Sequence, residues 1–222
     1  MEKILLAWSG GKDSAMALYT LKKAGAYEAV ALLTTMTEGY DRISMHGVRR
    51  TLLEAQADSL GIPLEKIYIS QRSSNEEYEV RMKEKLTEYQ GRGISAVAFG
   101  DIFLEDLKKY REGNLAKIGM RGLFPIWKRP TAELANAFID LGFEAIITCV
   151  DSNSLDGSFA GRCFDKKFLS DLPSAVDPCG ENGEFHSFVC DGPLFRQRIP
   201  FDIGEITLRE ERFFYRDLVQ RL

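Results

Sequence analysis

A short run near the start of the chain, Ser-Gly-Gly-Lys-Asp-Ser at positions 9–14, has the composition of an anion-binding turn. Two adjacent glycines let a ligand approach the backbone closely, and the N–H groups that begin a helix carry partial positive charge. Lys12 adds a full positive charge, and the hydroxyls of Ser9 and Ser14 can donate hydrogen bonds to the same oxygens. Glycine turns without a ligand also occur, but these neighbours favour a phosphate cradle made of Ser9, Gly10, Gly11, Lys12, Asp13 and Ser14.

Asp13, within this run, has two interpretations that the sequence leaves open. Its carboxylate can hold Mg²⁺ beside the phosphates, with Asp101 as a second candidate ligand. It can instead cap the helix that follows. The first interpretation predicts Mg²⁺ as a cofactor of the site.

The residues on either side of the run predict a turn between a strand and a helix. Ile4 to Trp8 are apolar over the length of a buried strand, which the serine and the two glycines then end. From Asp13 onward, apolar residues recur at helical spacing until Gly25, where a helix would close. The cradle therefore lies where a helix begins.

Two other nucleotide-binding motifs are excluded by the same residues. The Walker A pattern needs a glycine and a serine or threonine where this chain has Leu6 and Asp13, and the dinucleotide fingerprint Gly-x-Gly-x-x-Gly does not occur in the run. The run instead resembles the PP-loop of the ATP pyrophosphatases, enzymes that split ATP between its α and β phosphates. That resemblance implies ATP as the ligand.

A second motif, Asp177 to Phe195, carries Glu181 and Glu184 in a glycine-containing loop directly before an apolar strand. Carboxylates in loops are usually solvated. Flanking glycines and the entry to a buried strand, however, suit carboxylates that bind an amine, ammonia or a metal ion. Both glutamates are therefore candidate binding residues.

Together with Gln56–Leu64 and Ala145–Asp165, these motifs resemble the diphthine–ammonia ligase family of PP-loop ATP pyrophosphatases over nearly the whole chain. The resemblance implies the last step of diphthamide synthesis, the ATP-dependent amidation of a modified histidine on elongation factor 2 with ammonia. Met45–Leu53 and Phe99–Glu112 look more like a bacterial branch of the family, which is not expected to make diphthamide and whose acceptor is unassigned.

The chemistry that the resemblance implies is activation of a carboxylate by adenylation. The carboxylate attacks the α-phosphate of ATP, pyrophosphate leaves, and ammonia displaces AMP. Lys12 and the cradle would hold the pyrophosphate, while Glu181 and Glu184 would orient the acceptor or take a proton from ammonium. Arg162 would face negative charge at the adenylate, or be a surface arginine. His46 would touch the substrate, or be solvated.

Strand-like and helix-like segments alternate along the first part of the chain. Strands are expected over residues 4–8, 26–35, 64–70, 94–100 and 123–127, and helices over 13–25, 47–61, 75–93 and 101–119, with Asn75 as an N-cap. This alternation predicts an α/β fold with a Rossmann-like, mostly parallel sheet covered on both faces.

Ligands of such sheets bind beyond the carboxyl ends of the strands. Thr34 and Thr35 end the second expected strand, and Gly100 and Asp101 end the fourth. A nucleotide held at the cradle would reach the first pair with its base and the second pair with its ribose or metal ion.

Near Lys128 the pattern changes to one helix, one strand and a glycine-rich, aromatic segment with short strand-like pieces. We expect a PP-loop ATP-binding domain over residues 1–127. A smaller α+β domain that binds the substrate is expected over residues 128–222.

The composition of the 222 residues narrows the functional classes. A net charge of −4 disfavours a nucleic-acid partner, and four cysteines without a Cys-x-x-Cys pair disfavour a zinc site and indicate reduced thiols. No run has the length of a signal peptide or a membrane span, so we expect a cytoplasmic protein without a membrane partner. A homodimer is compatible with the sequence, although no heptad repeat argues for it.

Two alternative functions use the same cradle. A tRNA-modifying enzyme would share the ATP chemistry, but sulfur insertion usually needs a catalytic cysteine, and RNA binding needs a basic surface; neither is evident. A nucleotide-binding sensor without catalysis would not need to keep Lys12, Asp13 and both serines.

Overall fold

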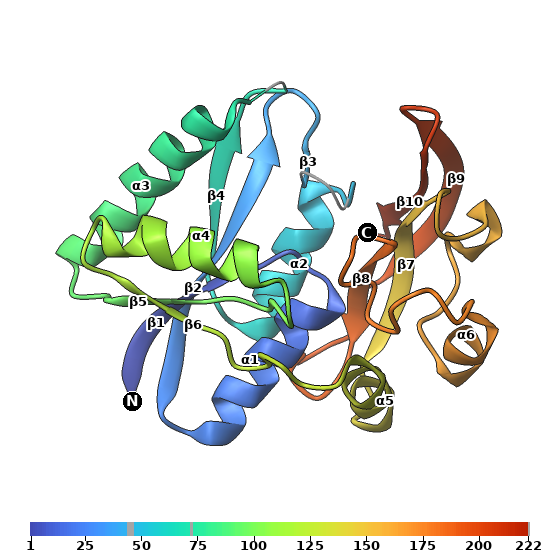
Figure 1. Cartoon of the computed structure of the whole chain (residues 1–222), viewed down its shortest axis with the longest axis horizontal. Helices are drawn as coiled ribbons and strands as arrows, with labels where there is room; N and C mark the ends of the chain where they lie inside the picture. Colours follow the sequence, from blue (N-terminus) through green and yellow to red (C-terminus); the bar gives the residue numbers. More distant parts are fainter. Residues whose placement is uncertain (44–46, 72, 222) are drawn as a thin grey trace.

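The computed structural model describes residues 1–43, 47–71 and 73–221. Its first sheet consists of β1 (Glu2–Ala7), β2 (Tyr27–Thr37), β3 (Arg42–Ile43), β4 (Leu64–Ile69), β5 (Ala96–Ala98) and β6 (Arg121–Leu123) (Figure 1). Parallel pairs join β1 to β2 and β5, β2 to β4, and β5 to β6, while β3 is antiparallel to the end of β2. The predicted α/β fold with a mostly parallel sheet is confirmed.

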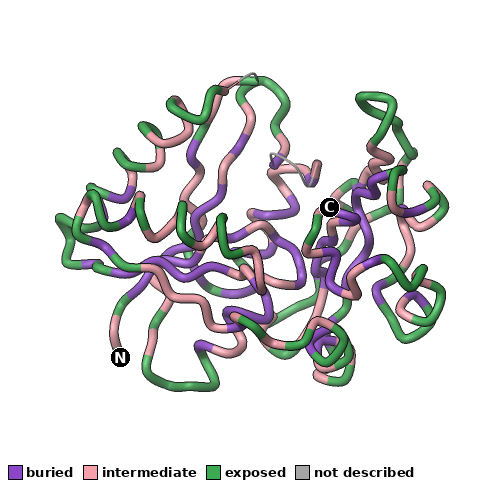
Figure 2. Tube along the Cα trace, in the orientation of Figure 1, coloured by how far each residue is buried: buried purple, intermediate pink, exposed green. Residues whose placement is uncertain are grey.

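Successive side chains of these strands point to opposite faces of the sheet, and apolar side chains occur on both faces. Helices therefore cover both faces. On one face, Ile4 and Leu6 pack with α1 (Lys12–Ala24) and α2 (Arg50–Leu60). On the other, Leu5 packs with α3 (Asn75–Gly91) and α4 (Glu105–Ala116). The buried segments in Figure 2 follow these strands through the middle of the molecule.

The second sheet is antiparallel, in the order β8–β7–β10–β9. Its strands are β7 (Glu144–Asp151), β8 (Phe185–Asp191), β9 (Phe201–Arg209) and β10 (Phe213–Gln220), accompanied by α5 (Thr131–Asp140), α6 (Lys166–Asp171) and the 3-10 turn η1 (Gly157–Phe159). Phe188 of β8 shares one apolar cluster with Met16 of α1. The start of α1 therefore lies between the two sheets, beside β8 (Figure 1).

Two local predictions are wrong. The strand expected over 123–127 is β6, Arg121–Leu123, and residues 125–128 form a turn, because Pro125 has no N–H to donate to a neighbouring strand. The N-cap of α3 is Ser74 rather than Asn75: the Ser74 hydroxyl accepts a hydrogen bond from the Glu77 N–H at 3.1 Å.

The remaining sequence expectations concern cysteines and membranes. All four cysteines are free, and Cys149, Cys179 and Cys190 are buried as small apolar residues. Within the described residues, none of the helices has both the length and the apolar character that crossing a bilayer requires.

Candidate active site

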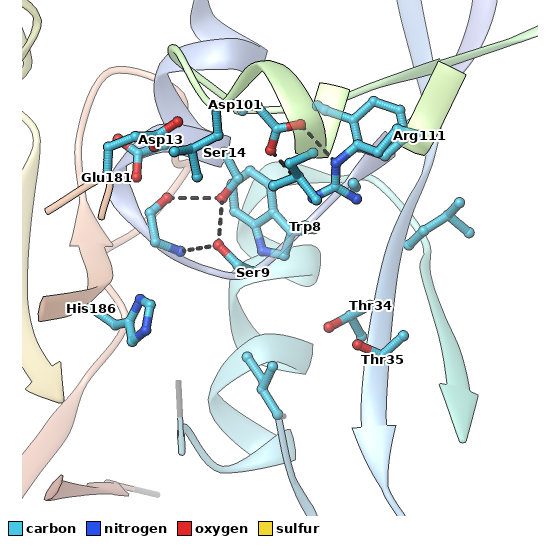
Figure 3. Close-up of a pocket in the computed structure, with 18 of the residues that line it drawn as sticks. Trp8, Ser9, Asp13, Ser14, Thr34, Thr35, Asp101, Arg111, Glu181 and His186 are labelled. Carbon is cyan, nitrogen blue, oxygen red and sulfur yellow. Dashed lines mark hydrogen bonds and ion pairs between the residues drawn. The ribbon is translucent and has the colours of Figure 1, made fainter. Parts of the chain in front are cut away.

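A cavity of about 580 Å³ lies at the carboxyl ends of β1, β2 and β5, where the first sheet meets the second. We call it the central cavity. Side chains from both sheets and from α3 and α4 line it; Figure 3 labels Trp8, Ser9, Asp13, Ser14, Thr34, Thr35, Asp101, Arg111, Glu181 and His186. The cavity thus lies at the carboxyl ends of the strands, where the sequence predicts that a ligand binds.

Residues 9–14, the phosphate loop, form one wall of this cavity. Gly10 has a φ of +78°, a left-handed conformation that glycine adopts without strain. The Gly11 N–H donates to Ser9 Oγ at 3.3 Å, and Ser14 Oγ donates to the Gly11 carbonyl at 2.8 Å. The serines of the motif therefore brace the turn from within, and their hydroxyls line the cavity.

The second sheet contacts the phosphate loop directly. The Lys12 backbone N–H donates to Ser187 Oγ of β8 at 3.2 Å, and the Val189 N–H of β8 donates to the Gly10 carbonyl at 2.9 Å. Residues more than 170 positions apart in sequence thus build the same turn. The phosphate loop follows a strand of the first sheet and is held in place by hydrogen bonds to a strand of the second.

Lys12 and Asp13 form a buried ion pair at the loop. The Lys12 side chain is 4% exposed, and its Nζ donates to Asp13 Oδ2 at 2.8 Å. Burial is the largest influence and opposes the positive charge, but Asp13, Cys179 and Glu181 together raise the pKa of Lys12, so the ammonium group is kept.

The structure contradicts one of the two interpretations of Asp13. Asp13 does not cap α1: the N-cap is Gly11, without a side-chain hydrogen bond. Asp13 Oδ1 is buried and has no hydrogen-bond partner among the described residues. A carboxylate oxygen left unpaired beside a phosphate loop fits a divalent cation.

Glu181 and Glu184, on the loop of residues 177–184 that we call the glutamate loop, point in different directions. Glu181 lines the central cavity, and its Oε1 accepts hydrogen bonds from the N–H groups of Ile102 at 2.7 Å and Phe103 at 3.2 Å. Burial raises the pKa of Glu181 to about 7, and the negative charge of Asp13 adds to this. Glu181 can therefore exchange a proton near neutral pH.

Glu184 is only 5% exposed and does not line the central cavity. Its carboxylate accepts from the backbone N–H groups of Asp177 and Asn182, both at 3.0 Å, and from Asn182 Nδ2 at 2.9 Å. These bonds close the glutamate loop on itself. The structure thus gives Glu184 a role in shaping the loop that presents Glu181.

Thr34 and Thr35 of β2 line the cavity on the side away from the second sheet. Thr34 is 3% exposed, and its Oγ1 is buried without a hydrogen-bond partner among the described residues. A buried hydroxyl without a partner is costly, so a polar edge of a ligand fits here.

Gly100 and Asp101, at the end of β5, have distinct environments. A Cβ at Gly100 would lie 2.8 Å from the backbone carbon of Asp13, so this glycine lets the strand end approach the phosphate loop. Asp101 lines the cavity, and its carboxylate accepts from Arg111 Nε at 2.7 Å and Nη2 at 3.2 Å (Figure 3).

Comparison with known protein families gives a match in both parts of the chain. Residues 1–122 match the family described as the diphthamide synthase N-terminal domain, and residues 130–219 match the diphthamide synthase C-terminal domain. The chain belongs to the diphthamide synthase family. The family resemblance inferred from the motifs is thereby confirmed.

Curated relatives of this diphthamide synthase family member carry one name. The chain is 29% identical over 227 residues to the diphthine–ammonia ligase of Schizosaccharomyces pombe, in an alignment that covers 92% of this chain but only 37% of that protein. It is 25% identical to the human diphthine–ammonia ligase, covering 93% of this chain and 85% of the relative, and 27% identical to the Danio rerio protein, covering 93% and 89%.

Arg162, like Glu184, is a predicted site residue that is not brought to the central cavity. Arg162 pairs with Asp171 at 2.6 Å and its guanidinium group lies over the ring of Phe159, 4.7 Å from the centroid. It does not line the cavity. His46 lies outside the described residues.

The structure of this diphthamide synthase family member adds site residues that the sequence analysis missed, chiefly Arg111 and His186. Arg111 shares a face of α4 with Leu107 and Asn114, a spacing of four and three residues that could have indicated it. His186 follows the glutamate loop in β8; burial and the positive charge of Lys12 lower its pKa to about 4, so it is neutral at pH 7.

Proposed function

We propose that this chain is an ATP-dependent, amide-forming ligase that activates a carboxylate as its adenylate, with release of pyrophosphate, and transfers the acyl group to ammonia with release of AMP. The observation that supports this most is the meeting of two parts at one cavity. The phosphate loop with Lys12 comes from the first sheet, and Glu181 with its raised pKa comes from the second. This chemistry requires groups that bind the phosphates and a group that accepts a proton.

The proposed role of the phosphate loop is to bind the β and γ phosphates of ATP. A cavity of about 580 Å³ lies within the range of small-molecule sites. Lys12 would oppose the charge that develops on the departing pyrophosphate, because its ammonium is held in place by Asp13. Thr34 and Thr35 would meet the nucleoside, and the unpaired Thr34 hydroxyl offers a hydrogen bond to it.

Asp13 is the residue that would hold Mg²⁺. Its unpaired Oδ1 supplies an oxygen ligand of the kind this ion prefers. When bound, the ion would neutralise part of the triphosphate charge. Asp101 is the weaker candidate for a Mg²⁺ ligand, because its carboxylate already forms an ion pair with Arg111.

The proposed acceptor enters from the side of the second sheet. The carboxylate oxygen bonds to the α-phosphorus as the bond to pyrophosphate breaks; the ammonia nitrogen then bonds to the acyl carbon as the bond to AMP breaks. Glu181 would take the proton that nitrogen loses, since its pKa of about 7 suits a general base at neutral pH. The names of the relatives support a diphthine-bearing elongation factor 2 as acceptor and ammonia as nitrogen source.

Product analysis tests the proposed function. The purified chain is incubated with Mg²⁺, ATP, ammonium and elongation factor 2 that bears diphthine, and nucleotides and acceptor mass are measured. The expected products are AMP, pyrophosphate and the amidated acceptor, formed only when the acceptor is present. ADP and phosphate would overturn the mechanism, AMP that depends on tRNA would favour the RNA-modifying alternative, and binding of ATP without turnover would favour the sensor.

Replacing Glu181 with glutamine is expected to change how stability depends on pH. The pKa of Glu181 is about 7 in the folded chain against an ordinary value of 4.5, so the native state keeps a proton that the unfolded chain has already lost. Raising the pH through this window therefore costs native stability in the wild type, and the neutral glutamine escapes that cost.

The measurement is the thermal midpoint of both proteins between about pH 5 and pH 8. The midpoint of Glu181→Gln relative to wild type should rise across this range and then level off. The exposed Glu76→Gln variant of α3 is the control and should show no such trend. A constant difference between Glu181→Gln and wild type would contradict the raised pKa.

A further inference from the structure

A buried glutamine of α2 contacts three parts of the molecule that meet behind the phosphate loop. Gln56 is 0% exposed. Its Nε2 donates to the Gly10 carbonyl at 3.0 Å and to the Val189 carbonyl at 2.6 Å, and its Oε1 accepts from the indole Nε1 of Trp8 at 2.9 Å. One side chain therefore joins the phosphate loop, β8 of the second sheet and the end of β1.

The contact with Gly10 fixes a peptide unit of the phosphate loop. The Gly10 carbonyl and the Gly11 N–H belong to one planar trans peptide, so an oxygen held towards β8 keeps the N–H on the opposite side. Gln56 and the Val189 N–H both hold that oxygen. That N–H donates to Ser9 Oγ at a long 3.3 Å, and a rotated peptide would place a carbonyl there, where an anion needs a donor.

The three hydrogen-bond partners of Gln56 can all be satisfied by a single uncharged amide group. Two carbonyl oxygens need donors and one indole N–H needs an acceptor, and a single carboxamide supplies both. Glutamate would offer only acceptors to the two carbonyls, and methionine would offer no strong donor. Gln56 also packs against the loop, since a Cβ on Gly10 would lie 2.8 Å from Gln56 Oε1.

We propose that Gln56 is a positioning residue for nucleotide binding: it holds the Gly10–Gly11 peptide in its anion-binding orientation and couples the phosphate loop to β8. The inference rests on the proposed function only in taking ATP as the ligand of the loop. It makes the second sheet part of the nucleotide site, through a residue that does not line the cavity.

The test compares Gln56→Met, which has a similar length and lacks the amide, with Ser59→Ala on the same helix. Ser59 is also buried, and its Oγ donates to the Gln197 carbonyl at 2.6 Å and accepts from the Gln197 N–H at 3.1 Å. Both variants therefore remove a hydrogen bond between α2 and the C-terminal part of the chain, but only Gln56 contacts the phosphate loop. Three quantities are measured on the full chain: the thermal midpoint, the Kd for ATP with Mg²⁺, and backbone hydrogen exchange of the loop.

Both variants should lower the thermal midpoint, but only Gln56→Met should raise the Kd, by about tenfold, and speed exchange at residues 10–13. Gln56→Glu keeps the shape without the donors and should resemble Gln56→Met. Loop exchange and affinity equal to wild type in Gln56→Met, or the same losses in Ser59→Ala, would overturn the inference. If the wild type binds no ATP, the proposed function fails, and loop exchange still decides the role of Gln56.

Discussion

Replacing Lys12 with methionine is expected to lower the rate of AMP formation by about 10²- to 10³-fold, the usual cost of removing one preorganised group that stabilises developing charge. Lys12 is the cation of the phosphate loop itself, and its ammonium is fixed by a 2.8 Å bond to Asp13 and by the ring of Phe185, 5.4 Å away. It is already in place before the pyrophosphate leaves, so its contribution should be greatest in the transition state.

The distinction between ground state and transition state can be measured. Because the proposed role of Lys12 is to oppose charge that grows during the reaction, kcat should fall by a larger factor than the Kd for ATP rises. Lys23→Met, at the exposed end of the same helix, is the matched control and should leave both constants near those of wild type. A raised Kd with kcat unchanged would show that Lys12 only binds ATP, and no change in either constant would remove Lys12 from the site.

The phosphate loop could be predicted from sequence because its chemistry is contiguous. Six adjacent residues carry the glycines, the lysine and the hydroxyls. The apolar residues on either side of them predict the strand and the helix between which the loop lies. The role of Asp13 could not be settled in the same way, since capping and metal binding use the same carboxylate. The structure excludes capping because Gly11 is the N-cap, and Asp13 Oδ1, which has no hydrogen-bond partner among the described residues, keeps metal binding as a proposal.

The two glutamates show a sharper limit of sequence reasoning. Glu181 and Glu184 stand in the same loop, three positions apart, and nothing in their neighbours distinguishes them. Gly180 and Gly183, with φ of +67° and +87°, turn the chain so that Glu181 faces the cavity and Glu184 faces the backbone of its own loop. A backbone turn of this kind decides which carboxylate remains available, and the turn depends on the bonds that Glu184 itself accepts.

Side chains that reach the site from separate elements were the hardest to predict. Arg111 lies on the exposed-looking, charged helix α4, and His186 lies in β8, far from the phosphate loop in sequence. His186 becomes a cavity residue because the two sheets meet, and Arg111 becomes one through its ion pair with Asp101 at the end of β5. Arg162 shows the converse: its motif suggested a role at the adenylate, but Asp171 and Phe159 hold it elsewhere.

Replacing Gly100 with alanine is expected to weaken ATP binding by about tenfold or more and to destabilise the fold by about 1–3 kcal/mol, the usual cost of overpacking. The added Cβ would lie 2.8 Å from the carbon and 2.9 Å from the oxygen of the Asp13 carbonyl group, and 2.9 Å from the Ser14 nitrogen. All three are backbone atoms at the start of α1, so no side-chain rotation can relieve the contact. Either the end of β5 or the phosphate loop must move.

Gly113→Ala is the matched control, because a methyl group added to this glycine of α4 would meet nothing within 4 Å, and the residue has no positive φ. Alanine there should stabilise the helix by up to about 1 kcal/mol and leave ATP binding unchanged. Thermal midpoints and ATP affinities of the two variants separate the effects. If Gly100→Ala bound ATP as tightly as wild type, the phosphate loop would tolerate displacement, and the close approach of β5 would not be what fixes its geometry. If affinity falls, the strand end acts on the nucleotide through the loop backbone, and Gly100 need not touch the ribose at all.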